Sequence, residues 1–293
     1  RSASRHFSDP AAVAHYHQGP PRLVPGFHDL QRMAQVLLAE RAPPDARVLV
    51  LGAGGGLELK AFADAQPGWT FDGVDPSHEM LELALDTVGE HAARIRLHEG
   101  YVDVAPDGPF DAAACLMTMH FMPLCERRHA LRVLRQRLRR GAPFVVAHMS
   151  FAQDEEERAL WLARDEAYAV ASGAPPEEAH HRREVIERVL PVLAPEQDEA
   201  LLREEGFKDV SLFYAGGVVR AWIGSAYPRL TRRPTGPCRR WPAARPPGSP
   251  PFPRPPPRRR RTGRAAWPAR RLHAGAAPAA SPPVAPPAGS RGR

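Results

Sequence analysis

Glycines and one aspartate form the pattern in this chain that best suggests ligand binding. Gly52, Ala53, Gly54 and Gly56 directly follow the apolar run VLVL, which is typical of a buried parallel strand. Glycine lets the backbone approach a ligand closely, and the N–H groups at the start of the next helix are free to bind it. Asp75 stands about 20 residues further on, at the end of a second expected strand, where a carboxylate reaches both hydroxyls of an adenosine ribose. Together the two features predict a site for an adenosine-containing ligand.

The spacing of the glycines separates two kinds of cofactor. A dinucleotide-binding turn follows the pattern G-x-G-x-x-G, and its third glycine would fall at Leu57. The pattern here is G-x-G-x-G over Gly52, Gly54 and Gly56, which favours S-adenosylmethionine (SAM) over NAD or FAD. A tight strand-to-helix turn that binds nothing is the structural alternative.

Strands and helices alternate through the first half of the chain. Ser77 is the expected N-cap of one helix and Gly141 the expected C-cap of another. This alternation predicts an α/β fold with a doubly wound, mostly parallel sheet. The expected strands are 48–51, 70–75, 95–100, 110–122 and 143–149, and the expected helices are 27–41, 57–65, 77–88 and 125–141.

The pattern changes after Ser150. Three helices are expected without intervening strands, and we interpret them as a helical insert over the sheet edge, spanning about 151–198. Ser211–Gly224 then predicts an antiparallel hairpin that turns at Gly216–Gly217, giving seven strands in all. The expected organisation is an N-terminal segment over 1–26, one domain over 27–227 and a disordered tail over 228–293.

Charge is divided unevenly along the chain. The formal net charge is +7, yet the segment after residue 227 is rich in arginine and proline and holds no Asp, Glu or Lys, so residues 1–227 are acidic overall. An acidic body favours a small-molecule partner over nucleic acid, although tRNA stays open as an alternative. The tail is interpreted as a dispensable disordered extension or a reading-frame artefact, with an arm for anionic surfaces as the functional alternative.

Other classes of protein find little support. Cys115, Cys125 and Cys238 show no C-x-x-C spacing, so neither disulfides nor a metal site is expected. No apolar run reaches membrane-spanning length and the start lacks a signal-peptide pattern, so we expect a cytoplasmic protein without a membrane partner. The sequence does not specify the oligomeric state.

Several segments resemble the class I SAM-dependent methyltransferase family over roughly residues 20–226. They are VLVLGAGGG, GVDPSHEML, FDAAACLMTMHFM, LRQRLRRGAPFVVAHM and LLREEGFKDVSLFYAGGVVRAWIG. The resemblance implies that Gly52–Gly54 cradle the methionine part, Asp75 holds the ribose, Tyr101 and Val102 flank the adenine, and the surroundings of Leu116 line the methyl-donor site. The full set expected to bind the cofactor is Gly52, Ala53, Gly54, Gly56, Asp75, Pro76, Tyr101, Val102 and Leu116.

Within that family the chain is most similar to the branch that makes carboxy-SAM for tRNA uridine modification. The segments VPGFHDL and HHRREVIERVL carry this likeness, and they imply that Arg183 meets the extra carboxylate. The chain departs from the branch at Phe27, Tyr101 and Leu116, where the branch has a tyrosine, a carboxylate and an amide. It also has Val50 where most methyltransferases have an acid. The resemblance therefore carries over the SAM site and not the specialised chemistry.

Residues outside the cofactor site are candidates for the acceptor side. His120 and His148 end two strands and are candidate general bases, with a packed histidine as the alternative. Met117, Met119, Phe121 and Met122 could form an apolar acceptor wall, and Trp161, Tyr168, His180 and His181 could line the acceptor pocket, with ordinary packing as the alternative. The predicted function is methyl transfer from SAM to a small molecule. The alternatives are tRNA modification of the carboxy-SAM type, a non-catalytic SAM-binding protein and, last, an NAD oxidoreductase.

Overall fold

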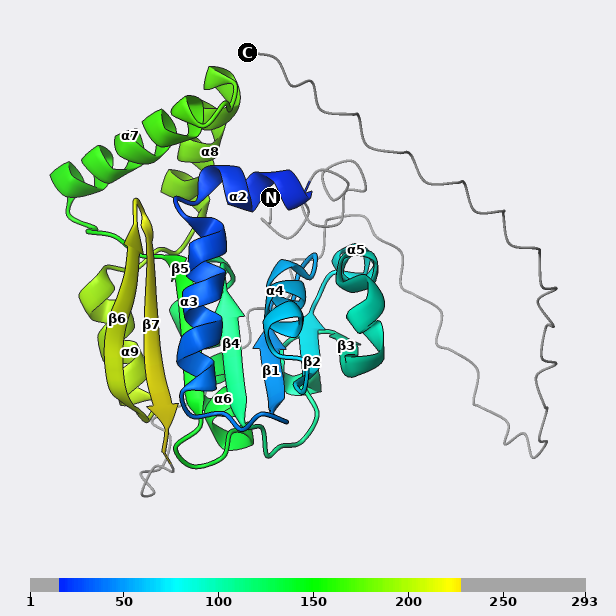
Figure 1. The fold of residues 1–293 in the computed structure, drawn as a ribbon. Coiled ribbons are helices and arrows are strands. Elements are labelled where there is room, and N and C mark those ends of the chain that lie inside the picture. Colours follow the sequence, from blue (N-terminus) through cyan, green and yellow to red (C-terminus); the bar gives the residue numbers. More distant parts are fainter. Residues whose placement is uncertain (1–15, 228–293) are drawn as a thin grey trace, which may run out of the picture. The chain divides into compact units, whose positions relative to one another are not determined.

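The computed structural model describes residues 16–227, which contain a seven-stranded sheet with helices on both faces (Figure 1). The strand order is β3-β2-β1-β4-β5-β7-β6; β1 to β5 run parallel and β7 is antiparallel to both β5 and β6. The predicted fold class is confirmed for these residues, whereas the predicted tail lies outside them. The strands are β1 (Arg47–Leu51), β2 (Thr70–Asp75), β3 (Ile95–Glu99), β4 (Ala112–Leu116), β5 (Pro143–Met149), β6 (Phe207–Gly216) and β7 (Val219–Ala226).

The order of the strands reverses direction between β1 and β4. In open α/β sheets the crevice at such a reversal, outside the carboxyl ends of the strands, is where ligands bind. The glycine turn follows β1 and Asp75 ends β2, so both lie at this edge. The topology thus places the predicted binding residues where such a sheet binds ligands.

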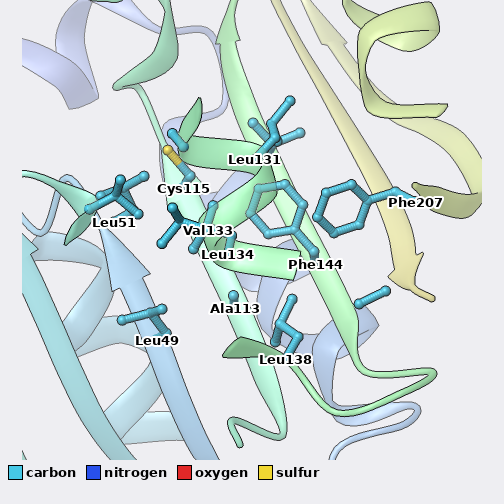
Figure 2. Close-up of a cluster of buried hydrophobic side chains, with 14 of the residues drawn as sticks. Leu49, Leu51, Ala113, Cys115, Leu131, Val133, Leu134, Leu138, Phe144 and Phe207 are labelled. Carbon is cyan, nitrogen blue, oxygen red and sulfur yellow. The ribbon is translucent and has the colours of Figure 1, made fainter. Parts of the chain in front are cut away.

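Helices cover the central strands on both faces. On one face, α3 (Phe27–Ala39), α4 (Leu57–Ala65) and α5 (His78–Val88) bury residues such as Leu38, Phe62 and Val88 against the sheet. On the other face, α6 (Leu124–Arg137) and α9 (Pro195–Glu204) close a core around Phe144 and Phe207, whose ring centroids are 4.9 Å apart (Figure 2). Because both faces are covered, β4 and β5 are apolar without alternation.

The helical insert is smaller than predicted. It consists of α7 (Glu155–Ala171) and α8 (Pro176–Val189), which pair with each other above the sheet (Figure 1). The third predicted helix, α9, instead buries Leu201 and Leu202 in the same core as α6. The sequence pattern located this helix but could not show which surface its apolar side covers.

Two elements near the site differ from the prediction. β4 ends at Leu116, because Met117 has a left-handed backbone (φ 55°), and a short 3₁₀ helix, η5 (Met119–Phe121), follows. At the N-terminal side, η2 (Tyr16–Gln18) and α2 (Gly19–Leu23) precede α3, where no helix was expected. The prolines there suggested irregular chain, but proline in the first turn of a helix is compatible with helix formation.

Three smaller features complete the description. α6 ends at Arg137, so Gly141 lies in the turn beyond it and is not its C-cap. The hairpin turns at Gly217 and Val218, one residue later than predicted, because Gly216 still pairs with Val219. Ser77 is the N-cap of α5 as predicted, accepting a hydrogen bond from the Met80 N–H at 3.2 Å. The remaining short helices are η3 (Gly89–Arg94) and η4 (Val102–Val104).

Candidate functional site

The glycine turn and Asp75 are joined directly. The Gly54 N–H donates a hydrogen bond to Asp75 Oδ2 at 3.0 Å, and the Ser77 N–H donates to Asp75 Oδ1 at 3.0 Å. The Gly52 and Ala53 N–H groups both donate to the carbonyl oxygen of Val74, at 2.8 and 3.0 Å. The ends of β1 and β2 therefore converge, as the predicted site requires.

The glycines of the turn meet different requirements. All three alternate glycines have positive φ, at 76° for Gly52, 47° for Gly54 and 80° for Gly56. A Cβ on Gly56 would lie 2.9 Å from the Cα of Ala84, and one on Gly52 would overlap Thr118. A Cβ on Gly54 would come no closer than 3.4 Å to any other atom, at the hydroxyl of Tyr16. Gly52 and Gly56 thus serve packing of the turn, and Gly54 is the position with space beside it.

Tyr16 covers the turn from the N-terminal segment. A Cβ on Gly55 would lie 2.8 Å from Cδ1 of the Tyr16 ring, so the ring sits on the backbone of the turn. Burial raises the pKa of Tyr16, and the carboxylates of Glu58 and Asp75 raise it further. Sequence analysis missed this residue, because a tyrosine outside any recognisable helix carries no signal of what it contacts.

Two acids lie beneath Tyr16. Glu58, in the first turn of α4, is only 8% exposed. Burial raises its pKa to about 8; its own backbone N–H opposes this and Asp75 adds to it. Burial also raises the pKa of Asp75, against the N–H groups of Ser77 and Gly54. Sequence analysis missed Glu58 as well, since a glutamate in the first turn of a helix is expected there for the helix dipole alone.

The residues predicted around the adenine lie at the end of β3. The Gly100 N–H donates to the carbonyl oxygen of Asp75 at 2.9 Å, which brings the following residues to the same edge. Tyr101 is 67% exposed, whereas the side chain of Val102 belongs to the core on the α6 face. Pro76 is exposed beside Asp75. Adenine binding by these residues stays a prediction. Because the Val102 side chain is in the core, Val102 would contact the adenine through its backbone.

The tip of β4 leans over the start of the glycine turn. Leu116 is buried, Met117 has the strained backbone noted above, and the Thr118 hydroxyl donates to the Leu116 carbonyl at 3.0 Å. Strained backbone persists only where its surroundings enforce it, and it clusters at functional sites. Met117 packs against an apolar cluster formed by the N-terminal segment, β5, β7 and the insert.

The two candidate histidines belong to a buried charged cluster on the α6 face. His148 Nε2 lies 3.1 Å from Asp198 Oδ2, and Arg127 Nη1 donates to Asp198 Oδ1 at 2.9 Å. His120 is also buried, and burial, followed by His148 and Arg127, lowers its pKa well below the usual value. Both histidines are 2% exposed, which favours the packed alternative over a general base.

The candidates on the insert are held by ion pairs. Arg183 Nη1 lies 2.9 Å from Glu166 Oε2, and His180 Nδ1 lies 3.1 Å from Glu166 Oε1. Arg182 pairs with Asp165, and burial lowers the pKa of Arg182 to about 10. Of the predicted acceptor-pocket residues, Trp161 is stacked by Arg164 and Arg220, Tyr168 is partly exposed, and His181 is exposed.

Comparisons with known proteins point to methyltransferases and related SAM-using enzymes. The family described as a methyltransferase domain matches residues 48–141. A carboxy-S-adenosyl-L-methionine synthase from Chromohalobacter salexigens is 29% identical over 200 residues, covering 66% of this chain and 73% of that protein. One from Campylobacter fetus is 22% identical over 209 residues, covering 70% and 88%.

A solved structure shows the same fold. The human N-acetylserotonin methyltransferase, determined in complex with SAM, is 14% identical with a TM-score of 0.51, covering 76% of this chain. The chain spans 58% of the length of that protein.

None of the helices in residues 16–227 is long and apolar enough to cross a membrane.

The order of the strands and the joined ends of β1 and β2 define a SAM-dependent methyltransferase fold. Residues 48–141 match the methyltransferase-domain family, and the chain is similar to class I SAM-dependent methyltransferases, whose cofactor, SAM, is the predicted one.

The site fits SAM on its own chemistry. A ribose offers two hydroxyl donors, and each oxygen of Asp75, having accepted one N–H, keeps a lone pair for another donor. The space beside Gly54 is bounded by Tyr16 and Met80. The positive charges of SAM would be compatible with the buried Glu58 and the half-buried Asp75.

Proposed function

We propose that this protein transfers the methyl group of SAM to a small-molecule nucleophile. The observation that carries the proposal is the hydrogen bond from the Gly54 N–H to Asp75, which holds the glycine turn and the ribose-binding carboxylate together at the reversal of the sheet. Asp75 would hold the ribose, Gly52–Gly54 the methionine part, and the surroundings of Leu116 the methyl group.

When bound, SAM supplies a methyl group on a positively charged sulfur, which a nucleophile can displace directly. Such a displacement needs alignment and exclusion of water more than a covalent intermediate. Tyr16 covers the turn, and Gly54, Gly55 and Gly56 are buried beneath it. These residues would shield the reacting atoms from water.

The acceptor side of the site is apolar. Met117 at the tip of β4 and Leu57 at the start of α4 pack against a buried apolar cluster that includes Met149. An acceptor approaching the tip of β4 would therefore meet side chains of this cluster. Together with the acidic charge of residues 1–227, this supports a small and largely apolar acceptor over a nucleic acid.

Substitution of Asp75 tests the cofactor site. Asp75→Asn should lower SAM affinity at least tenfold, since an amide cannot accept from the two backbone N–H groups and also from two hydroxyls. Asp86→Asn, an exposed carboxylate on α5, is the matched control and should leave the affinity unchanged. Equal affinities of the two variants in titration calorimetry would refute the role of Asp75.

Carboxy-SAM formation is the second candidate, because the similar proteins from Chromohalobacter salexigens and Campylobacter fetus are carboxy-SAM synthases. It would require Arg183 to receive an additional carboxylate, and here Arg183 is paired with Glu166. We therefore favour methyl transfer. Mass spectrometry of the nucleoside that copurifies with the protein decides between them: S-adenosylhomocysteine, the product of methyl transfer, supports methyl transfer, and a ligand of carboxy-SAM mass supports the synthase.

A further inference from the structure

Glu58 is a buried acid without an ion-pair partner among residues 16–227. Its side chain is buried in the first turn of α4, and among residues 16–227 no Lys, Arg or His forms an ion pair with it. Buried carboxylates in proteins are usually paired with a cation or bind a metal. A second acid, the half-buried Asp75, raises the pKa of Glu58 further.

The groups that face Glu58 come from three different elements. They are the Tyr16 phenol of η2, the Asp75 carboxyl of β2 and the Cys115 thiol of β4. None of these groups becomes positively charged. Glu58 closely follows the glycine turn in the chain, and within residues 16–227 its own backbone N–H is the contact that favours its ionised form.

We propose that Glu58 binds the α-ammonium group of SAM. The inference rests on SAM binding at the glycine turn, where Asp75 takes the ribose and the methionine part lies along Gly52–Gly54, next to the first turn of α4. The ammonium group is the part of the cofactor that combines a positive charge with hydrogen-bond donors. It supplies the cationic partner that residues 16–227 do not supply.

This role has a consequence for protons. In the free protein near pH 7 most Glu58 carboxyls carry a proton, because the pKa is about 8. Contact with an ammonium group favours the ionised carboxylate, so binding should release a proton. An α-amino group remains charged at this pH. Between pH 6 and 7.5 the affinity should therefore rise with pH by up to about tenfold per unit.

Three ligands separate the parts of the cofactor. SAM has the ammonium group and the sulfonium charge, S-adenosylhomocysteine keeps only the ammonium group, and methylthioadenosine has neither. Calorimetry at pH 7 in two buffers of different ionisation enthalpy should show release of about one proton for the first two ligands and none for the third. Release with SAM alone would assign Glu58 to the sulfonium and overturn the proposal.

Glu58→Gln is the decisive variant. It should weaken SAM and S-adenosylhomocysteine roughly tenfold or more, abolish their proton release and leave methylthioadenosine unchanged. Other polar groups nearby, such as His17 at the Gly55 carbonyl, are common to both proteins and cancel in the comparison. Glu58→Asp keeps the charge one methylene further back and should retain proton release with intermediate affinity.

The outcomes separate this inference from the proposed function. If the variant binds SAM as well as the wild type does, or loses all three ligands equally, the role of Glu58 is overturned while SAM binding stands. If the wild type binds none of the ligands, the proposed function fails and the inference fails with it. Thermal unfolding of each variant confirms that the comparison is between folded proteins.

Discussion

At the scale of single residues, the site brings two carboxyl groups and a tyrosine together. The N–H groups of Gly54 and Ser77 favour the ionised form of Asp75, although burial raises its pKa overall. Glu58 is buried more deeply, and burial raises its pKa to about 8. A cationic group bound beside Glu58 would favour its ionised form.

The free energy of unfolding of the ligand-free protein should depend on pH because of Glu58. The folded pKa is raised above the unfolded value, so the stability associated with the protonated carboxyl is present at low pH and lost as pH rises from about 4.5 to 8. Glu58→Gln removes this loss. Relative to wild type, the variant should gain about 4 kcal/mol in the free energy of unfolding between pH 5 and pH 9. Urea denaturation without ligand at the two pH values measures it.

The control for that measurement is Glu90→Gln, which changes an exposed carboxylate. Its difference from the wild type should not vary with pH by more than about 0.5 kcal/mol. A pH-independent difference for Glu58→Gln would mean that the buried carboxyl has an ordinary proton affinity.

At the scale of elements, one buried cluster ties α9 to the rest of the domain. Asp198 in the first turn of α9 contacts Arg127 of α6 and His148 of β5, and all three are buried. Burial by itself would raise the pKa of Asp198, but His148 and Arg127 outweigh it and lower that pKa. His148 and Arg127 therefore have a structural role, which is to balance the buried charge of Asp198.

Removing Asp198 should therefore be costly. Asp198→Ala leaves the Arg127 charge buried without a partner, which should cost about 3–5 kcal/mol of unfolding free energy near pH 7. Since the folded pKa is lowered, this contribution is present above the unfolded pKa and lost as pH falls through the folded pKa. Glu199→Ala removes the more exposed pair with Arg203 on the same helix and should cost under about 1 kcal/mol. Comparable losses for both variants in urea denaturation would contradict the cluster.

At the scale of the whole molecule, residues 16–227 contain the complete sheet and both of its hydrophobic faces. A chain ending at residue 227 should therefore keep its melting temperature within about 2 °C. Its SAM affinity should stay within about twofold of that of the full chain. Loss of SAM binding on truncation would show that the segment after 227 contributes to the site.

The same pair of chains tests the charged tail. If the tail is an arm for anionic surfaces, the full chain should bind RNA in a strongly salt-dependent manner and the truncated chain should not. If the tail is dispensable, the two chains should bind RNA equally weakly. Fluorescence anisotropy with a labelled RNA at two salt concentrations distinguishes these results.

Sequence by itself determined the alternation of strands and helices, the glycine turn and the position of Asp75, because these depend on local periodicity and on spacing along one strand–helix unit. It also located α9 and the two histidines, but not what they contact. Only the tertiary structure placed Tyr16 on the turn, buried the Glu58 side chain and brought His148 to Asp198. Those contacts join segments distant in the chain, and their energies come from packing and desolvation, which no local pattern records.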